Sequence, residues 1–514
     1  MSTRNLTNGG RRSIDLLLIA VPAFHVPLLV VAKSAFGIGR PERMLLIGAV
    51  IWGLGGVSLG LLRRLRASRQ VSVLGVWLTT YLFMNTGMIP QTIGYPLGLL
   101  ATVAVTGIIL YLVSRRPMPR LHLVLGIASV LLLAEVALAG LSTASQIGES
   151  RVVAPADPLG IEFQHKPDIV FIVADAYIGV EGLDRYFEPT SDVEEHYSGL
   201  GFWAPELAFS PYASTDTALS TMLDMNYSMP EGEGINRATR RELYQRIGGH
   251  NRVVDVLHQN GYETTMIESG WSGSLCGDTV GTCVTSFIDE SLYVMLSRTW
   301  MADVVFEKFG YAFTAGAQSS MTWMDENLDE LTSDHNPDFV FAHLEIPHPP
   351  MFLDSECELQ VTSDRSGVTL QRGDVPLEYR KALYLDQAAC VNRFIARLSD
   401  SLPSDVVVIL TGDHGTDSRN QLSIHPDSWT VDMMRERLNA MFALRGPEEC
   451  QPPEPVFIAN VFVHLLECLS GETVPSLPQR MYIYGAAEFG GAPSPIIEVD
   501  PSTIRQIIGT SAGE

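Results

Sequence analysis

Five apolar segments occupy most of the first 141 residues of this 514-residue chain. Each is close to the roughly 20 residues that an α-helix needs to cross a hydrocarbon core of about 30 Å. A cleaved signal peptide would account for the first segment but not for the next four. The segments are Ile14–Phe36, Met44–Leu62, Val71–Ile89, Pro96–Val113 and Leu121–Leu141. The sequence therefore predicts a domain of five transmembrane helices over residues 1–142.

The basic residues predict how these helices are oriented. Clusters precede the first segment (Arg4, Arg11, Arg12) and follow the second (63–69) and the fourth (114–120), whereas Arg40 and Arg43 follow the first. The three clusters share one side of the membrane if the helices alternate, and the positive-inside rule makes that side cytoplasmic. Five crossings then predict a multi-pass protein of the cytoplasmic membrane whose C-terminal part is extracytoplasmic.

The charge is divided unevenly along the chain. Residues 1–150 hold 13 Lys and Arg against 4 Asp and Glu, a net charge of +9, and the remainder carries −32. Nucleic acids attract basic surfaces, so the acidic part argues against a nucleic-acid partner.

All six cysteines lie in the acidic part: Cys276, Cys283, Cys357, Cys390, Cys450 and Cys468. An even set in an oxidising compartment indicates disulfides. Cys276 and Cys283 flank the turn-rich GDTVGT and are expected to pair, whereas the connectivity of the other four stays open. A zinc site made of these cysteines is the alternative, and the absence of a Cys-x-x-Cys pair disfavours it.

Residues 143–166 are predicted to be a linker, and residues 167–514 a single outer domain. Strand-like apolar runs occur at 167–177, Glu263–Ile267, Asp338–Leu344 and Val406–Leu410, and helical patterns at Asn236–Ile247, Arg252–Asn260, Leu377–Leu402 and Val456–Leu469. This alternation predicts an α/β domain with a mostly parallel sheet. Functional residues of such sheets gather at the carboxyl ends of the strands.

Acidic and histidine residues follow two of the predicted strands. Asp175 ends the run IVFIVAD, and Asp413 and His414 stand between two glycines in TGDHG. A lone acid after a strand also serves as a helix cap. An Asp-His pair between glycines suits a metal better, because a carboxylate oxygen and an imidazole nitrogen can converge on one ion.

Two further segments of the sequence carry hydroxyl and imidazole groups. Ser214, Thr215, Asp216 and Thr217 precede a helical pattern, where a threonine is either an ordinary N-cap or a hydroxyl beside a phosphoryl oxygen held by the helix N-terminus. His348 lies in the loop PHPP after the run 338–344, and His343 lies within that run, where simple burial is the alternative to a functional role.

In order along the chain, PDIVFIVADAY, the Thr-bearing helix start, PHPP and TGDHG resemble the alkaline phosphatase/sulfatase superfamily. The five apolar segments make the chain most similar to the membrane-anchored, sulfatase-like branch that includes lipoteichoic acid synthases and lipid A phosphoethanolamine transferases. The resemblance spans about Pro167 to Pro447 and includes ERLNAMFALRGP (436–447), which is similar to a late strand of the family. It implies a five-helix membrane domain followed by an α/β alkaline-phosphatase-like domain.

The resemblance also implies a site. A divalent metal, zinc or manganese, would be bound by Asp175, Asp413, His414 and the nucleophile Thr215, with Thr217 and Ser214 as alternative nucleophiles. His348 would contact the transferred group or protonate the leaving group. Arg419, His425 and His343 are further candidates for substrate binding.

Two departures from the family bear on the substrate. The lipoteichoic acid and phosphoethanolamine branch usually has Glu at the position of Asp175. The stretch STDTA replaces the Cys-x-Pro-x-Arg motif of formylglycine sulfatases, which disfavours sulfate ester chemistry by that route.

The resulting functional prediction is a cell-envelope phosphotransferase. A head group of the phosphoglycerol or phosphoethanolamine type would pass from a membrane lipid through a phosphothreonine to an envelope glycan or lipid. The alternatives are a membrane-anchored phosphodiesterase, phosphatase or sulfatase-like hydrolase, and an inactive scaffold or sensor. The aromatic and apolar segment 289–321 is predicted either to dock lipid or the membrane domain or to be extra core packing.

Overall fold

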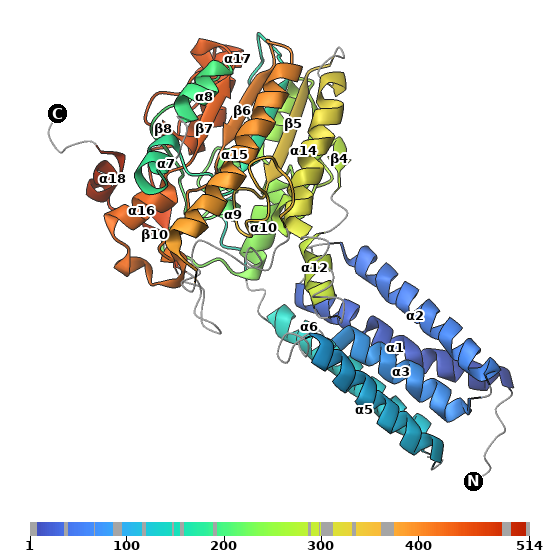
Figure 1. Cartoon of the computed structure of the whole chain (residues 1–514). Coiled ribbons are helices and arrows are strands. Elements are labelled where there is room, and N and C mark those ends of the chain that lie inside the picture. Colours follow the sequence, from blue (N-terminus) through green and yellow to red (C-terminus); the bar gives the residue numbers. More distant parts are fainter. Residues whose placement is uncertain are drawn as a thin grey trace. The chain divides into compact units, whose positions relative to one another are not determined.

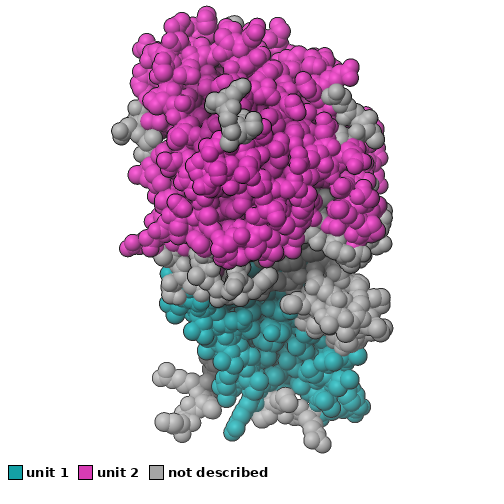
Figure 2. All heavy atoms as spheres, turned by 90° about the vertical axis from the view of Figure 1, so that its left-hand side faces the viewer, with its two compact units in different colours: residues 1–147, 290–309 teal, residues 148–289, 310–514 magenta. Residues whose placement is uncertain are grey.

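The computed structural model describes residues 8–34, 40–65, 67–85, 95–115, 120–145, 149–154, 159–188, 193–285, 289–297, 299, 312–331, 336–360, 375–485 and 495–509. The chain forms two compact units. The first comprises residues 1–147 and 290–309, and the second comprises residues 148–289 and 310–514. Figure 2 colours the two units separately.

The first unit is helical. Its described helices are α1 (Asn8–Ser34), α2 (Pro41–Arg64), α3 (Arg69–Asn85), α5 (Tyr95–Arg115), α6 (Leu121–Ser145) and α12 (Glu290–Ser297). Three of them, α1, α2 and α6, contain stretches long and apolar enough to cross a membrane. Helix α3 has 17 residues, and the described side chains of α5 begin only at Val103. The unit thus has the composition of a membrane anchor, and five crossings stay a prediction.

A buried acid joins four of these helices. Asp15 near the start of α1 is fully buried and pairs with Arg63 at the end of α2. It also accepts hydrogen bonds from Arg69 at the start of α3 (2.8 and 2.9 Å) and lies 3.1 Å from His122 at the start of α6. The starts of α1, α3 and α6 and the end of α2 therefore lie together, as alternating crossings require.

The second unit is built on a six-stranded sheet of order β4-β3-β5-β1-β6-β7 (Figure 1). The strands are β1 (Ile169–Ala174), β3 (Glu263–Ile267), β4 (Thr282–Val284), β5 (Asp338–Leu344), β6 (Val407–Thr411) and β7 (Phe442–Arg445). All neighbours pair in parallel except β6 and β7. The predicted α/β fold with a mostly parallel sheet is thus confirmed.

Helices cover both faces of the sheet because successive residues of a strand point to opposite sides. Val170, Ile172 and Ala174 of β1 pack with one set of helices: α7 (Val180–Tyr186), α8 (Val193–Gly199), α14 (Ala312–Leu331) and α15 (Leu377–Ser401). Phe171 and Val173 pack with the other: α9 (Thr215–Asp224), α10 (Arg237–Ile247), α11 (Arg252–Gln259) and α17 (Val461–Ser470). Every residue of β1 is fully buried, so its carboxyl end is fixed in the middle of the unit.

The remaining elements are short. They are the strands β2 (Ala208–Phe209), β8 (Val456–Phe457), β9 (Tyr482–Ile483) and β10 (Ile497–Glu498), and the helices α16 (Val431–Leu438) and α18 (Pro501–Ile508). The helix predicted over Val456–Leu469 is wrong at its start, because Val456 and Phe457 pair with β2 and α17 begins at Val461.

The six cysteines form three disulfides, Cys276–Cys283, Cys357–Cys390 and Cys450–Cys468. The expected first pair and the general expectation of disulfides are confirmed. The alternative of a cysteine zinc site is excluded in this state, because no sulfur is left as a thiolate.

Candidate active site

Three adjacent strand ends form the candidate site. Strand β1 lies between β5 and β6, with Ala174 opposite Leu344 and Val173 opposite Thr411. Since all three strands run in parallel, the residues that follow them emerge at one edge of the sheet. The topology therefore brings Asp175, the loop bearing His348 and the TGDHG loop together.

Asp175, Asp413 and His414 form a cluster whose ligand-type atoms all lie within 4.8 Å of one another. All three side chains are buried, and the His414 Nε2 atom lies 3.2 Å from Asp413 Oδ2 and 3.8 Å from Asp175 Oδ1. Both of these carboxylate oxygens lack a hydrogen-bond partner among the described residues. Buried, unpaired anionic oxygens are costly, and a divalent cation satisfies them together with an imidazole nitrogen.

His414 offers the nitrogen that a metal requires. Its Nδ1 lies 2.9 Å from the carbonyl oxygen of Gly415, which can only accept, so Nδ1 carries the proton and Nε2 presents its lone pair to the cluster. Burial lowers the pKa of His414, and the charge of Arg437 lowers it further, against the opposing effect of the two carboxylates. The imidazole is therefore neutral near pH 7.

The glycines of TGDHG permit the close packing that aims these ligands. A Cβ atom on Gly412 would lie 2.2 Å from the carbonyl oxygen of Tyr177, and one on Gly415 would lie 2.0 Å from that of Glu436. The backbone N–H of Ala176 donates to Asp413 Oδ1 at 2.9 Å, which leaves Oδ2 directed into the cluster. The Asp-His pair stands between glycines because the loop meets other backbone on both sides.

Thr215 is the hydroxyl residue that the structure brings to this cluster. It is the first residue of α9, and its Oγ1 atom lies 3.2 Å from His414 Nε2. The alternatives point elsewhere, because Thr217 Oγ1 donates to the carbonyl oxygen of Ser214 and the Ser214 hydroxyl donates to Asp216. The first turn of a helix leaves its N–H groups without carbonyl partners, so the N-terminus of α9 places donors next to the Thr215 hydroxyl, although the Thr217 N–H donates to Asp216 Oδ1 at 2.9 Å.

The geometry also identifies a residue that the sequence patterns missed. Arg437, near the end of α16, is buried, and its guanidinium donates to the carbonyl oxygens of Ala213 (2.8 Å) and Gly415 (3.0 Å). Its Nη2 atom lies 3.1 Å from His414 Nε2. Arg437 thus joins the segment before Thr215 to the TGDHG loop and supplies a cation beside both. The sequence gives no local signal for this role, because RER in a helix is typical of a solvated face.

His343 lies on the other side of Asp175. It is fully buried in β5, and its Nε2 atom lies 3.6 Å from Asp175 Oδ2 without a hydrogen-bond partner among the described residues. Burial raises the pKa of Asp175, but the attraction of His348 and the contacts with His343 and His414 outweigh it and hold that pKa well below its usual range. Asp175 is therefore a carboxylate that can serve as a ligand.

His348 is exposed, as expected for its place between two prolines. Its Nδ1 lies 2.6 Å from the carbonyl oxygen of Pro349, so Nδ1 carries a proton and Nε2 remains available to another group. Its attraction lowers the pKa of Asp175, but none of the hydrogen bonds or ion pairs of the described residues joins the two side chains.

Two of the candidate substrate-binding residues are engaged elsewhere. Arg419 pairs with Asp432 and lies over the ring of Tyr186, 5.4 Å from the ring centroid. His425 is exposed and accepts from the backbone of Asp427. Among the contacts of the described residues, none joins either side chain to the Asp175 cluster.

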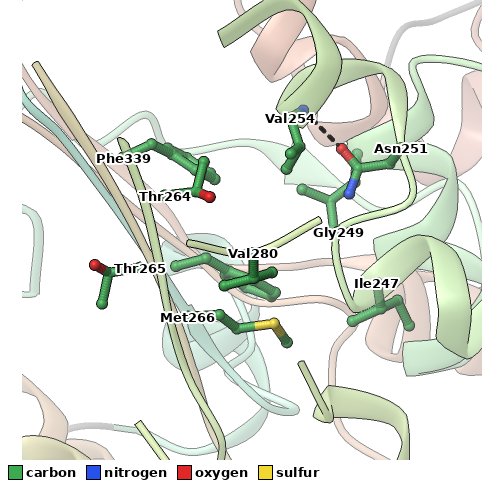
Figure 3. Close-up of a pocket in the computed structure, with 11 residues that line it drawn as sticks. Ile247, Gly249, Asn251, Val254, Thr264, Thr265, Met266, Val280 and Phe339 are labelled. Atoms are coloured by element: carbon green, nitrogen blue, oxygen red, sulfur yellow. Dashed lines mark hydrogen bonds between the residues drawn. The ribbon is translucent and has the colours of Figure 1, made fainter. Parts of the chain in front are cut away.

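A small cavity lies apart from the candidate site. Figure 3 shows it among residues that include Gly249 before α11, Thr265 and Met266 of β3, and Val280 before β4. Its volume of about 10 Å³ leaves space for no more than one water molecule. None of its lining residues belongs to the cluster, so it is a packing defect and not a substrate site.

Comparison with known proteins shows which protein family the sequence resembles. Residues 204–449 match the model of the sulfatase family. No curated protein matches the sequence. The segment contains Thr215, His348, Asp413 and His414 and lies wholly after Asp175. This match bears out the resemblance to the alkaline phosphatase/sulfatase superfamily: residues 204–449, slightly under half of the chain, are similar to the sulfatase family, which supports an enzyme of sulfatase-like type.

Several solved structures are distantly similar. The integral membrane lipooligosaccharide phosphoethanolamine transferase A from Neisseria meningitidis is 14% identical, with 88% of this chain and 95% of that chain covered and a TM-score of 0.37. The periplasmic domain of EptC from Escherichia coli is 14% identical, with 70% and 100% covered and a TM-score of 0.39. A sulfatase-like protein from Bacteroides fragilis, YidJ, is 16% identical, with 62% and 81% covered and a TM-score of 0.38. At such identities and scores the likeness does not extend to activity.

Proposed function

We propose that this protein is a phosphotransferase of the cell envelope. It would move a phospholipid-derived head group, of the phosphoglycerol or phosphoethanolamine type, through a phosphothreonine on Thr215 to an envelope glycan or lipid. The observation that carries the proposal is the position of the Thr215 hydroxyl, 3.2 Å from His414 Nε2, beside two buried carboxylates that each have one oxygen without a hydrogen-bond partner among the described residues.

The ligand atoms of this cluster fit a divalent cation, with zinc favoured by the imidazole ligand and manganese by the carboxylates. Asp175, Asp413, His414 and Thr215 would hold it. When bound, such an ion lowers the pKa of a coordinated hydroxyl and neutralises phosphoryl oxygens.

The residues of the chain perform the remaining tasks. Thr215 Oγ1 loses its proton to solvent and attacks phosphorus, and the bond from phosphorus to the oxygen of the lipid alcohol breaks. His348 donates a proton to the departing alcohol from Nε2 and must be protonated again before the next turnover. An acceptor hydroxyl or amine then gives its proton to the His348 imidazole and attacks phosphorus, and the Thr215 oxygen is released and takes up a proton from solvent. Arg437 and the N-terminus of α9 stabilise the phosphoryl oxygens by charge-assisted hydrogen bonds.

The first unit supports a lipid donor. Its apolar helices suit a multi-pass anchor in the cytoplasmic membrane, with basic ends in the cytoplasm and the second unit outside. Helix α12 of the segment 289–321 contacts α1 and α2, and its Leu292 and Met295 are buried. This placement favours docking on the membrane helices for residues 290–297, whereas Ala317 and Met321 of the same segment belong to α14 and pack in the core of the catalytic unit.

A hydrolase is the second candidate. The chemistry up to phosphothreonine is the same, and the two differ only in whether water or an envelope acceptor resolves the intermediate. The exposure of His348 favours this candidate, because an open site admits water.

Mass spectrometry of Thr215 tests both the nucleophile and the transferred group. Purified protein is incubated with vesicles of a phosphatidylglycerol or a phosphatidylethanolamine, quenched in acid and digested. We expect Thr215 to carry the phosphorylated head group of one lipid, and a Thr217→Ala variant to carry it as well. Labelling of Thr217 or Ser214 in place of Thr215 would overturn the assignment, and a bare phosphate on Thr215 would favour a phosphatase.

A further inference from the structure

Helix α15 presents two buried polar side chains, Tyr384 and Gln387, to the edge of the sheet that carries the candidate site. They lie three residues apart and therefore share one face of the helix. Both are fully buried, although a tyrosine hydroxyl and a carboxamide are costly to bury unless every polar atom is paired. Their partners are backbone groups of two segments of the site.

Tyr384 holds the turn that follows β1. Its hydroxyl donates to the carbonyl oxygen of Ala176 at 2.8 Å and accepts from the backbone N–H of Ile178 at 3.0 Å. Ala176 has a φ of 58°, a left-handed conformation that a residue with a Cβ adopts only when its surroundings impose it. The hydroxyl thus joins both ends of a strained turn.

This turn determines the orientation of both carboxylates of the cluster. Asp175 directly precedes Ala176, and the Ala176 N–H donates to Asp413 Oδ1. The left-handed conformation of Ala176 therefore directs the Asp175 side chain and, through one hydrogen bond, the orientation of Asp413. Loss of the Tyr384 hydroxyl would relax the turn and misplace two ligand-type oxygens at once.

Gln387 holds the loop that bears His348. Its Oε1 atom accepts from the N–H groups of Phe352 (3.1 Å) and Leu353 (3.3 Å). Its Nε2 atom donates to the carbonyl oxygens of Pro347 and His348, both at 3.3 Å. One carboxamide thus binds the loop backbone on both sides of His348. The disulfide Cys357–Cys390 anchors the far end of the loop to the same helix.

We infer that Tyr384 and Gln387 are separate positioning residues for the two halves of the site. Tyr384 positions the metal-binding carboxylates Asp175 and Asp413, and Gln387 positions His348 against the leaving group. The roles assigned to Asp175, Asp413 and His348 rest on the proposed function, whereas the hydrogen bonds of Tyr384 and Gln387 do not.

Metal affinity tests the first half. Full-length protein in lipid nanodiscs is stripped with a chelator and titrated with Zn²⁺ against a fluorescent competitor. Tyr384→Phe is compared with Tyr197→Phe, which removes another fully buried hydroxyl next to α15, where it donates to Asn392 at 2.7 Å. We expect Tyr384→Phe to weaken Zn²⁺ binding about tenfold or more and Tyr197→Phe to stay within about twofold of the parent. Equal affinities of the two variants would overturn the role of Tyr384.

Leaving-group dependence tests the second half. Gln387→Met keeps an unbranched side chain and removes the four hydrogen bonds. Two phosphodiesters are used as donors, one with an alkyl alcohol as leaving group and bis(p-nitrophenyl) phosphate, whose phenolate departs without a proton. We expect Gln387→Met to bind Zn²⁺ normally but to lose at least about tenfold more turnover with the alkyl donor than with the nitrophenyl donor. Equal losses with both donors would overturn the role of Gln387.

Failure of the proposed function can be told apart from failure of the positioning roles of Tyr384 and Gln387. A parent protein that binds Zn²⁺ but consumes neither donor would refute the proposed function and leave the affinity comparison of Tyr384→Phe and Tyr197→Phe valid. In that case amide hydrogen exchange decides on Gln387, because Gln387→Met should speed exchange at Phe352 and Leu353 at least about tenfold while Tyr197→Phe should not. Unchanged exchange at these two amides would refute the positioning role.

Discussion

Asp413→Asn should separate the stability of the catalytic unit from its ability to bind metal. The asparagine carbonyl can occupy the place of Oδ1 and still accept from the Ala176 N–H, now held at 2.9 Å. The amide nitrogen then takes the place of Oδ2, 3.2 Å from His414 Nε2, where it can donate to the lone pair of the imidazole. The substitution therefore preserves the hydrogen bonds of the loop and replaces an anionic ligand by a donor.

The expected magnitudes follow from charge. Ligand-type oxygens of Asp175 and Asp413 lie within 4.8 Å, and two unit charges at that distance repel by about 3.5 kcal/mol at an effective dielectric constant near 20. Without metal, the variant should be at least as stable as the parent because this repulsion is removed. With metal, the loss of one charge beside a divalent ion costs at least about 4 kcal/mol, which is roughly a thousandfold in affinity.

Elemental analysis and thermal unfolding with and without chelator measure both effects. In the presence of chelator, the melting temperature of the variant should equal or exceed that of the parent. With metal at a hundred times the dissociation constant of the parent, only the parent should gain stability, by about 2.7 kcal/mol. The matched control is Asp417→Asn, a buried aspartate of the same loop that accepts from Leu422 and lies outside the cluster. Full metal content in Asp413→Asn, or equal loss in Asp417→Asn, would refute the ligand assignment.

Three further predictions concern Arg437, His414 and the membrane topology. Arg437→Lys should slow formation of phosphothreonine roughly 100-fold while metal affinity changes little. Lysine keeps the charge but cannot donate to Ala213, Gly415 and the phosphoryl group together. Quenched-flow mass spectrometry measures the rate of phosphothreonine formation, and a rate like that of the parent would contradict the prediction. Because the pKa of His414 is lowered in the folded protein, the folded state binds this proton less readily than the unfolded chain, whose reference pKa is 6.5. The contribution of His414 to stability is therefore present above about pH 6.5 and is lost as the pH falls below it. Denaturant unfolding between pH 5 and 8 should show that the free energy of unfolding depends less steeply on pH in His414→Gln, and an unchanged dependence would refute the direction of the pKa shift. A reporter active only outside the membrane should give signal when fused after residue 150 and none when fused after Arg66, and the reverse result would overturn the topology.

The sequence predicted the elements whose signal is local. Strands β3 and β5 begin and end at the predicted residues, because β5 is mostly an apolar run and β3 is rich in β-branched residues. Strands β2 and β8 have two residues each and leave no periodicity to recognise. The helical pattern over 456–469 was misread at its start for this reason, since the pairing that makes Val456 a strand residue comes from a segment more than 240 residues away.

The site divides in the same way. Asp413 and His414 were predictable because ligand-type residues between glycines at a strand end are unusual in ordinary packing. Arg437 and Gln387 were not, since an arginine or glutamine within a helical pattern is typical of a solvated surface, and only the fold buries them. The pairing of Cys357 with Cys390 was also beyond the sequence, because six cysteines allow 15 connectivities and spacing does not choose among them.

The connectivity between the two units bears on transferase against hydrolase activity. The chain passes from the first unit to the second after residue 147, returns at residue 290 and leaves again after residue 309. Three covalent connections tether the second unit to the first, and under the proposed function this tether raises the effective concentration of a lipid donor at the site. Water is equally available to both kinds of enzyme, and only an acceptor held in attack geometry can outcompete it. A tether to the membrane is therefore of most use to an enzyme whose donor stays in the bilayer and whose acceptor is bound beside it. That combination favours the transferase.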